Sequence, residues 1–320
     1  MTRVTSGLDP YTDASVLLEG KDLSGRTAIV TGGATGIGIE TVRALAGAGV
    51  DVMIAVRNKA SGDAAAALIN GELGAPRVSV GVLDLSDLAT VAAFATGWGD
   101  RPLHMLINNA GVMACPLTYT ADDLEMQLGT NHFGHFALGM GLARALMNGA
   151  EEGRGARLVS LSSIAHLRSA MDFDDPHYRT RAYEKWQAYG QSKTANALFA
   201  VGFHQRFADL GVTANAVMPG GIMTPLQRHL PREEMIAMGW MDEAGVIATG
   251  FKTPAQGAST SVWAATGDEL EGVGGLYLEN LAQAETFKPG DRFGVAPHAL
   301  DPDAADRLWA LSEETTGAKL

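Results

Sequence analysis

A tyrosine and a lysine four residues apart are the pair in this sequence best suited to acid–base chemistry. Tyr189 and Lys193 lie in a predicted helix, so their side chains share one face of it. A phenol with a pKa of about 10 is a poor proton carrier at neutral pH, and a nearby ammonium group lowers that pKa by stabilising the phenolate. Such pairs also arise by chance on helix surfaces, so the meaning of this one depends on its surroundings.

Serine hydroxyls upstream of Tyr189 are suited to complete such a site. Ser160, Ser162 and Ser163 end a predicted buried strand. The carboxyl ends of parallel strands are where doubly wound proteins bind ligands. A serine there can hydrogen-bond a substrate oxygen on which charge develops. These serines could equally well serve as turn or helix-cap residues.

A glycine-rich turn after the first predicted strand is suited to a phosphate group. Gly32, Gly36 and Gly38 lead directly into a predicted helix, with the spacing G-x-x-x-G-x-G. Gly32 can take the tight turn, Gly36 lets backbone approach a pyrophosphate, and Gly38 lets helix and sheet pack closely. The helix N-terminus adds free N–H groups and a positive dipole end. A glycine turn without a ligand is the alternative.

The ends of the second and third predicted strands bear on which dinucleotide would bind. A free ribose 2′-hydroxyl usually meets an acidic residue there, whereas a 2′-phosphate needs a cation. Residues 55–59 contain no acid, and Arg57 can grip a phosphate and stack on adenine. Asp84 can accept from the adenine amino group. Equally open are a solvated Arg57 and an Asp84 that serves as a helix N-terminal carboxylate.

Amides and hydroxyls follow the later strands. Residues 108–111 (Asn-Asn-Ala-Gly) end the fourth strand and suit a close turn beside a ligand. Asn131 lies inside a predicted helix, where Asn is a poor helix former, so it holds a water or bends the helix. Thr224, after Pro219 and Gly220, is free to touch a phosphate or a carboxamide.

The elements that must position these residues alternate regularly. Short, mostly apolar runs rich in Val, Ile, Leu and Met predict strands at 27–30, 51–56, 78–82, 105–108, 157–161, 212–217 and 275–278. Helices are predicted at 36–48, 59–70, 87–98, 121–148, 183–210, 254–265 and 302–314, with Ser86 as the N-cap of the third. The order predicts an α/β fold: one doubly wound, Rossmann-type parallel sheet with helices on both faces.

Three stretches lie outside the alternation. Residues 1–25 form an N-terminal extension and residues 164–182 a polar insertion. Residues 222–252 are too long for an ordinary connection and are interpreted as a lid. No second domain or linker is evident, so residues 26–320 are interpreted as a single dinucleotide-binding domain that includes the lid.

Composition limits the possible partners. The chain has 320 residues, of which 46% are hydrophobic and 19% charged, as in a globular protein. A net charge of −12 argues against nucleic acid or an anionic membrane as the partner. The sequence has no apolar run of about 18 residues and no signal-peptide layout, so we expect a cytoplasmic protein without a membrane span. One cysteine, Cys115, excludes an internal disulfide, and His132 and His135 lack the partners of a metal site.

Taken together, the motifs over about residues 25–280 resemble the short-chain dehydrogenase/reductase family. The resemblance implies a catalytic tetrad of Asn131, Ser163, Tyr189 and Lys193, with Ser162 as the alternative serine. It implies NADP(H) as cofactor because Arg57 follows a small apolar residue; NAD(H) is less favoured. A second basic residue, frequent in the family's glycine turn, is missing here. The implied cofactor-binding set is Gly32, Thr35, Gly36, Ile37, Gly38, Arg57, Asp84, Leu85, Asn108, Ala110, Gly111, Tyr189, Lys193, Pro219, Gly220 and Thr224.

Finer motifs resemble the retinol dehydrogenase-like subgroup. They are Ser-Ser-Ile-Ala-His at 162–166, Thr-Asn-His-Phe-Gly-His-Phe at 130–136 and Arg-Leu-Trp at 307–309. Light-dependent protochlorophyllide reductases share some of these, but they carry a lid cysteine that this chain lacks. His166 is expected either to line the substrate mouth or to lie on a loop surface.

The expected function is therefore NADP(H)-dependent interconversion of a small-molecule alcohol and its aldehyde or ketone. The methionines of the lid favour a lipophilic substrate, although packing of a lid helix explains them equally well. A homo-oligomer is possible. Two alternatives stay open: a non-catalytic NADP(H)-sensing regulatory protein, and an epimerase or dehydratase of the same fold that retains its cofactor.

Overall fold

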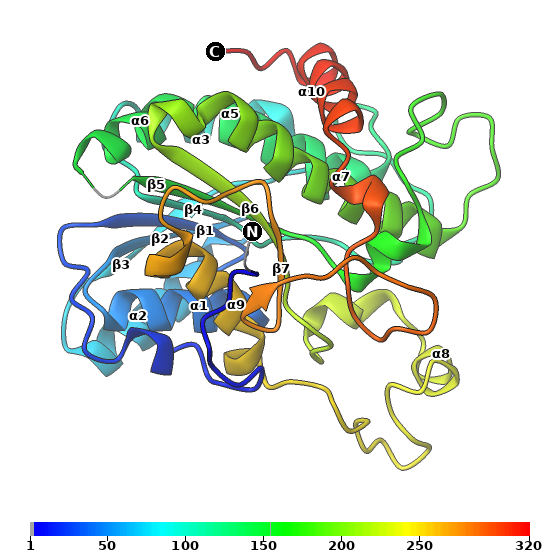
Figure 1. Cartoon of the computed structure of the whole chain (residues 1–320), viewed down its shortest axis with the longest axis horizontal. Helices are drawn as coiled ribbons and strands as arrows, with labels where there is room; N and C mark the ends of the chain where they lie inside the picture. Colours follow the sequence, from blue (N-terminus) through cyan, green and yellow to red (C-terminus); the bar gives the residue numbers. More distant parts are fainter. Residues whose placement is uncertain (1–2, 154) are drawn as a thin grey trace.

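A single eight-stranded sheet forms the middle layer of the molecule (Figure 1). The structure, a computed structural model, describes residues 3–153 and 155–320. The strand order is β3-β2-β1-β4-β5-β6-β7-β8, and every neighbouring pair is parallel except β7 with β8. The order reverses direction between β1 and β4, which makes a crevice at their carboxyl ends. The predicted α/β fold is confirmed.

The strands follow the apolar runs of the sequence closely. They are β1 (Thr27–Thr31), β2 (Asp51–Val56), β3 (Val78–Val82), β4 (Met105–Asn108), β5 (Ala156–Leu161), β6 (Val212–Met218), β7 (Tyr277–Glu279) and β8 (Ala282–Gln283). β7 begins later than predicted because Gly275 has a φ of 72°, which a strand does not use. The short antiparallel β8 was not predicted. It follows a tight turn in which Asn280 and Leu281 both take positive φ.

Helices cover both faces of the sheet (Figure 1). One face packs against α1 (Gly36–Gly47), α2 (Lys59–Leu73) and α9 (Pro254–Thr266). The other packs against α3 (Leu88–Trp98), α5 (Gly134–Gly141), α6 (Ala143–Glu151) and α7 (Lys185–Phe207), with α10 (Pro302–Thr316) outside α7. Strand side chains therefore lie in two apolar cores, one on each face, which explains why the strands lack polar alternation.

The helix predicted at 121–148 is wrong as a single element. The segment is divided into α4 (Met126–Leu128), a π-helical turn (Gly129–Phe133), α5 and α6. Glu125 caps α4 by accepting from the N–H groups of Gln127 and Leu128 at 3.0 and 2.8 Å, so the helix cannot start at residue 121. The π-helical turn contains Asn131, and such turns often occur at functional sites.

A smaller correction concerns the start of α3. Asp87, and not Ser86, is the N-cap, because its carboxylate accepts from the N–H groups of Ala89 and Thr90. Ser86 instead donates its hydroxyl to Asp84 at 2.6 Å. The segment therefore uses both residues, in consecutive turns, to lead from β3 into α3.

The N-terminal extension packs along the sheet edge and α9. Ser6 donates its N–H to the Leu281 carbonyl at 3.0 Å, and Ala14 donates to Ala255 at 3.1 Å. Further on, Leu23 donates to Ala48 at 2.8 Å, next to β1. The extension thus runs from the turn before β8 to the start of β1.

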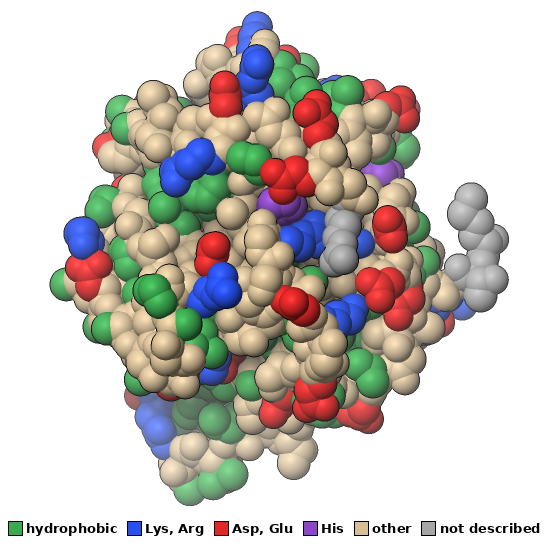
Figure 2. Space-filling model, turned by 90° about the vertical axis from the view of Figure 1, so that its left-hand side faces the viewer, with side chains coloured by type: hydrophobic (Ala, Val, Ile, Leu, Met, Phe, Trp, Pro, Cys, Tyr) green, Lys and Arg blue, Asp and Glu red, His purple; other side chains and the backbone are tan. Residues whose placement is uncertain are grey.

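The surface and the helices bear on the expected partners. On the face drawn in Figure 2, basic and acidic side chains are interspersed without a broad basic area. Across residues 3–153 and 155–320, no helix combines the length and apolar character that crossing a bilayer requires.

Candidate active site

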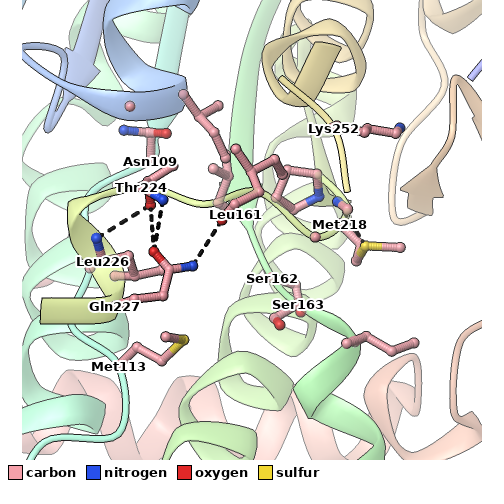
Figure 3. A pocket seen from close by; sticks show the side chains of 18 of the residues that line it. Asn109, Met113, Leu161, Ser162, Ser163, Met218, Thr224, Leu226, Gln227 and Lys252 are labelled. Atoms are coloured by element: carbon pink, nitrogen blue, oxygen red, sulfur yellow. Dashed lines mark hydrogen bonds between the residues drawn. The ribbon is translucent and has the colours of Figure 1, made fainter. Parts of the chain in front are cut away.

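A cavity of about 610 Å³ lies at the carboxyl ends of the central strands. Its walls come from the glycine turn after β1, the residues that follow β4, β5 and β6, the lid, and the N-terminal extension. Figure 3 shows Asn109 and Thr224 on one side of it, Ser162 and Ser163 below, and Lys252 on the far side. The crevice is therefore where the sheet topology predicts a ligand.

The glycine turn leaves room that side chains would fill. Gly32 and Gly36 have φ values of 66° and 58°, and a Cβ on Gly36 would lie 3.3 Å from Thr224. A Cβ on Gly38 would collide with the carbonyl oxygen of Gly32. Thr35, the N-cap of α1, makes no side-chain cap bond, so the first N–H groups of the helix lack a side-chain acceptor. This cradle suits a pyrophosphate, and Thr35 and Ile37 line it as expected.

Asn109, part of the predicted 108–111 turn but absent from the predicted cofactor-binding set, ties β4 to the glycine turn. Its side-chain amide donates to the Thr31 carbonyl at 2.8 Å, and the Thr31 hydroxyl accepts from the N–H groups of Asn109 and Ala110, each at 2.9 Å. Its neighbour Asn108 is buried outside the cavity lining, and its amide has no hydrogen-bond partner among the described residues. Of the predicted residues here, only Ala110 and Gly111 line the cavity.

Tyr189 lies on α7 at the cavity, buried to 4% exposure. Desolvation raises the pKa of its phenol to about 12, opposed by a hydrogen bond with the side chain of Ser163. The Lys193 Nζ atom is 5.7 Å from the centre of the tyrosine ring. In this geometry, the hydrogen bond with Ser163 favours the phenolate, and Lys193 lies near the ring without a hydrogen bond to the phenol oxygen.

Lys193 points into the site with an unusually low proton affinity. Burial lowers the pKa of its ammonium group to about 7. Its Nζ donates to the Leu161 carbonyl at 2.9 Å, at the end of β5. No carboxylate pairs with it among the described salt bridges. A buried cation without a counterion is costly, and such sites are often functional.

The two serines after β5 have different surroundings. Ser162 is 3% exposed and donates its hydroxyl to the Lys193 carbonyl at 2.7 Å, which holds β5 against α7. Ser163 lines the cavity, interacts with Tyr189, and accepts from the Ala165 N–H at 3.2 Å. Both serines border the cavity, but Ser163 is the one next to the phenol.

Both polar atoms of the Asn131 side chain are hydrogen-bonded to other residues of the protein. Its Oδ1 accepts from the Val112 N–H at 2.8 Å, and its Nδ2 donates to the Val112 carbonyl and to the Ser192 hydroxyl, each at 2.9 Å. It does not line the cavity. Its side chain therefore holds the loop after β4, and does not bend its own helix by bonding that helix's carbonyl groups.

The residues expected at the adenine end lie outside this cavity. Arg57 follows β2, is exposed, and has no hydrogen bond or ion pair among the described residues, whereas Lys59 is paired with Asp63 at 2.8 Å. Asp84 accepts from the N–H and hydroxyl of Ser86, which forms a turn before α3, whereas Asp87 caps the helix. Leu85 is buried in the core beside α5.

The lid covers one side of the cavity. Pro219, Gly220 and Thr224 line it. The lid continues through a short 3-10 helix, capped by Thr224 and Gln227, to α8 (Arg232–Ala237). Thr224 donates its N–H to Gln227 at 2.8 Å, drawn as a dashed line in Figure 3. The hydroxyl of Thr224 also takes part in this cap, so it is not wholly free.

An aromatic and apolar wall joins the lid to α7. Trp186 packs at 6.2 Å from Tyr189 and at 5.9 Å from Trp240 of the lid, ring centre to ring centre. Trp240 is in turn 6.1 Å from Phe251. Glu234 of α8 accepts from Lys185 Nζ at 2.6 Å and from Trp186 Nε1 at 2.8 Å. The lid is thus attached to the helix that carries Tyr189.

Sequence reasoning also missed residues from distant segments. Pro10 and Tyr11 of the N-terminal extension line the cavity, as do Arg292 and Phe293. No periodicity or motif in the sequence marks them, since they reach the site only through the tertiary path of their segments.

The histidines are packing and bridging groups. His132 is buried among Phe133, Phe136 and Phe199, and its Nε2 is 2.7 Å from the Ser312 hydroxyl. His135 bridges Thr31 to the main chain of Asn131. Within the described ranges no group of His, Cys, Asp or Glu could hold a metal ion. His166 is fully buried and does not line the cavity, so both positions expected for it are wrong.

Comparisons with known proteins agree with this arrangement. A family model described as short chain dehydrogenase matches residues 26–235. A "Probable oxidoreductase" of Streptomyces lividans is 50% identical, covering 93% of this chain and 99% of that protein. Retinol dehydrogenase 12 of Homo sapiens is 38% identical, covering 93% and 88%. The solved "RhlG/NADP active-site complex" of Pseudomonas aeruginosa is 25% identical, covers 77% and 91%, and has a TM-score of 0.59.

Proposed function

The chain belongs to the short-chain dehydrogenase/reductase family and is an oxidoreductase of its retinol dehydrogenase-like subgroup, and on that premise we propose that it uses NADP(H) to interconvert a lipophilic alcohol and its aldehyde or ketone. The observation that carries the proposal is that Ser163, Tyr189 and the buried Lys193 line one cavity together with the glycine cradle, with Ser163 placed to lower the pKa of Tyr189.

The glycine cradle suits the cofactor, which supplies or accepts the hydride when bound. The chain's own residues handle the oxygen and its proton. In oxidation, the Tyr189 phenolate takes the hydroxyl proton of the alcohol, and in reduction the phenol returns it. The Ser163 hydroxyl hydrogen-bonds the substrate oxygen as its charge changes.

Lys193 and Asn131 act on the same proton path. The ammonium group of Lys193, when charged, would add to the stabilisation of the phenolate by Ser163 and would bond the nicotinamide ribose. Its pKa of about 7 means that it can be charged or neutral near physiological pH. Asn131 is proposed to order a relay water; with its side chain bonded to Val112 and Ser192, that role would fall to its main chain.

The residues at the end of β2 favour NADP(H) over NAD(H). Arg57 is exposed and has no ion pair among the described residues, and no acid stands near it in sequence to repel a 2′-phosphate. A relative of known structure was solved as an NADP complex. The remaining members of the proposed cofactor set, Asp84, Leu85 and Asn108, would act through main-chain or indirect contacts, because their side chains are otherwise placed.

A lipophilic substrate is argued from the wall beside Tyr189. Trp186, Trp240 and Phe251 form an edge-to-face series there, and Met113 and Leu226 pack around it. A relative is named for retinol, a lipophilic alcohol. We further propose that residues 26–320 fold as one domain and that the protein is cytoplasmic and forms a homo-oligomer; fractionation of cells and light scattering test the last two.

The test is a turnover assay with NADPH and NADH on long-chain, aromatic and retinoid aldehydes, with Tyr189→Phe as the matched variant. We expect NADPH oxidation by wild type and a turnover at least about 100-fold lower in the variant, with NADPH binding retained. Near-normal turnover in Tyr189→Phe would contradict the assigned role. NADPH binding without turnover of any carbonyl would favour the sensing alternative. Substrate conversion without net NADPH consumption would favour the epimerase or dehydratase.

A further inference from the structure

Three hydrogen-bond donors converge on one main-chain oxygen next to the active site. The carbonyl oxygen of Ser163 is 3.0 Å from the His166 N–H, 2.7 Å from His166 Nδ1, and 3.0 Å from the Tyr277 hydroxyl. A carbonyl oxygen has two lone pairs, and a turn of this kind ordinarily uses one bond. The main chain of Ser163 is therefore held more firmly than the turn alone requires.

The main chain fixes the tautomer of His166. The N–H of Ala296 donates to His166 Nε2 at 3.0 Å, so this nitrogen must be the acceptor. The ring proton then lies on Nδ1, which donates it to the Ser163 carbonyl. His166 is 0% exposed, and desolvation lowers its pKa to about 4, so the ring stays neutral at physiological pH.

The Tyr277 hydroxyl, which also donates to the Ser163 carbonyl, is held in place and keeps its proton. The ring of Tyr277, in β7, packs 4.7 Å from the His166 ring, and burial raises the pKa of its phenol, which keeps it protonated. His298 also faces His166, with its Nε2 3.0 Å from the His166 carbonyl. Neither His166 nor Tyr277 lines the cavity, so neither is placed to touch a substrate.

The consequence falls on the hydroxyl of Ser163. That side chain leaves the main chain at the Cα atom, next to the carbonyl group held by His166 and Tyr277, and its hydroxyl accepts from the Ala165 N–H at 3.2 Å. A reacting group misplaced by about 1 Å can cost about 100-fold in rate. A fixed Ser163 main chain therefore keeps its hydroxyl directed at Tyr189.

We propose that His166 is a positioning residue: its Nδ1–H, together with the Tyr277 hydroxyl, holds the Ser163 main chain so that the serine hydroxyl meets both Tyr189 and the substrate oxygen. The inference rests on the proposed function for its kinetic consequence. His166 does not touch the substrate and acts only through Ser163.

Two amide substitutions separate the two ring nitrogens. In His166→Asn, the side-chain N–H₂ lies near the former Nδ1 and can still donate to Ser163. In His166→Gln, the amide lies near the former Nε2, so it can meet Ala296 but not Ser163. We expect kcat to fall about 10- to 100-fold in His166→Gln and to stay within about 5-fold of wild type in His166→Asn, with the KM for NADPH unchanged in both. Tyr277→Phe should give a smaller loss of the same kind.

A double-mutant cycle with Ser163→Ala tests whether His166 acts through the serine. In the Ser163→Ala background, His166→Gln should lower kcat by no more than about 3-fold, because the hydroxyl that it positions is already absent. Equal losses in both backgrounds would overturn the inference. So would a loss in His166→Asn as large as that in His166→Gln, or losses that merely follow the thermal unfolding temperature of each variant.

A measurement that needs no turnover keeps the inference separate from the proposed function. NMR of ¹³C-labelled tyrosine in the NADP⁺-loaded protein, assigned with Tyr189→Phe, follows the ionisation of Tyr189. We expect its pKa to rise by about one unit in His166→Gln and in Ser163→Ala, but not in His166→Asn. An unchanged pKa in His166→Gln would overturn the inference. A wild type without activity on any substrate would overturn only the proposed function.

Discussion

Replacing Lys193 by Met should make the protein more stable while abolishing its activity. The pKa of this ammonium group falls from 10.5 to about 7 on burial. At about 1.36 kcal/mol per unit, keeping the charged form costs the folded state as much as about 5 kcal/mol. Met removes that cost and fills similar volume. It loses one hydrogen bond of about 1 kcal/mol, but the Leu161 carbonyl still accepts from Asn196 at 2.8 Å.

The sign of the pH dependence follows from proton binding. Between pH 7 and 10.5 the folded protein binds fewer protons at Lys193 than the unfolded chain does, so wild-type stability rises with pH through this window. The cost is present in full below pH 7. We therefore expect Lys193→Met to gain about 2–4 kcal/mol at pH 6, after allowance for partial hydration of the charge, and less than about 1 kcal/mol at pH 10.

Urea unfolding of the ligand-free protein at pH 6, 8 and 10, followed by tryptophan fluorescence, measures this gain. The control is Lys59→Met, since Lys59 is an exposed lysine paired with Asp63, and we expect a change below about 0.5 kcal/mol at every pH. Turnover of Lys193→Met should be lower than wild type by at least about 100-fold. A gain that does not depend on pH, or a less stable variant at pH 6, would refute the reasoning.

Four further outcomes test other parts of the site. Arg57→Ala should lower kcat/KM with NADPH about 10- to 150-fold and leave NADH activity nearly unchanged, as measured by initial rates; equal losses would make Arg57 structural. Gly38→Ala should abolish NADPH binding in a fluorescence titration and lower the unfolding temperature, because its Cβ would collide with the Gly32 carbonyl, and normal binding would contradict the cradle. Amides of residues 222–252 should exchange hydrogen fastest in the α/β body and gain protection with NADPH plus substrate, and equal exchange would remove the lid interpretation. Alcohol oxidation should accelerate from pH 7 to 10, because burial raises the pKa of Tyr189 and phenolate forms only as pH rises; a flat profile would point to another base.

The sheet could be predicted because its signal is local. β2, β3 and β4 begin and end at the residues expected from their runs rich in Val, Ile, Leu and Met. β4 is buried along its whole length, and a strand buried on both faces needs continuous apolar sequence. The pair of Tyr189 and Lys193 was found for the same reason: a spacing of four on a helix places both side chains on one face.

The features that were missed depend on partners far away in the chain. The helix at 121–148 is interrupted where Asn131 finds the main chain of Val112, 19 residues earlier, a contact that propensity does not encode. His166 is buried because Tyr277 packs against its ring and the Ala296 N–H donates to its Nε2, and both residues lie more than 100 positions later in the chain. Arg57 could be selected from its position after β2. Only the structure shows that Lys59 is paired with Asp63, while Arg57 has no ion pair among the described residues.

The path of the N-terminal extension has a consequence for the order in which the chain folds during synthesis. Ser6 is translated long before Leu281, the residue whose carbonyl it bonds. At about 5–20 residues per second, its partner emerges about 15–55 s later. Tyr11, which lines the cavity, belongs to the same waiting segment. The ribosome therefore releases a nearly complete sheet before this wall of the cavity can close, and a nascent chain stalled before Leu281 would hold a cavity open on that side.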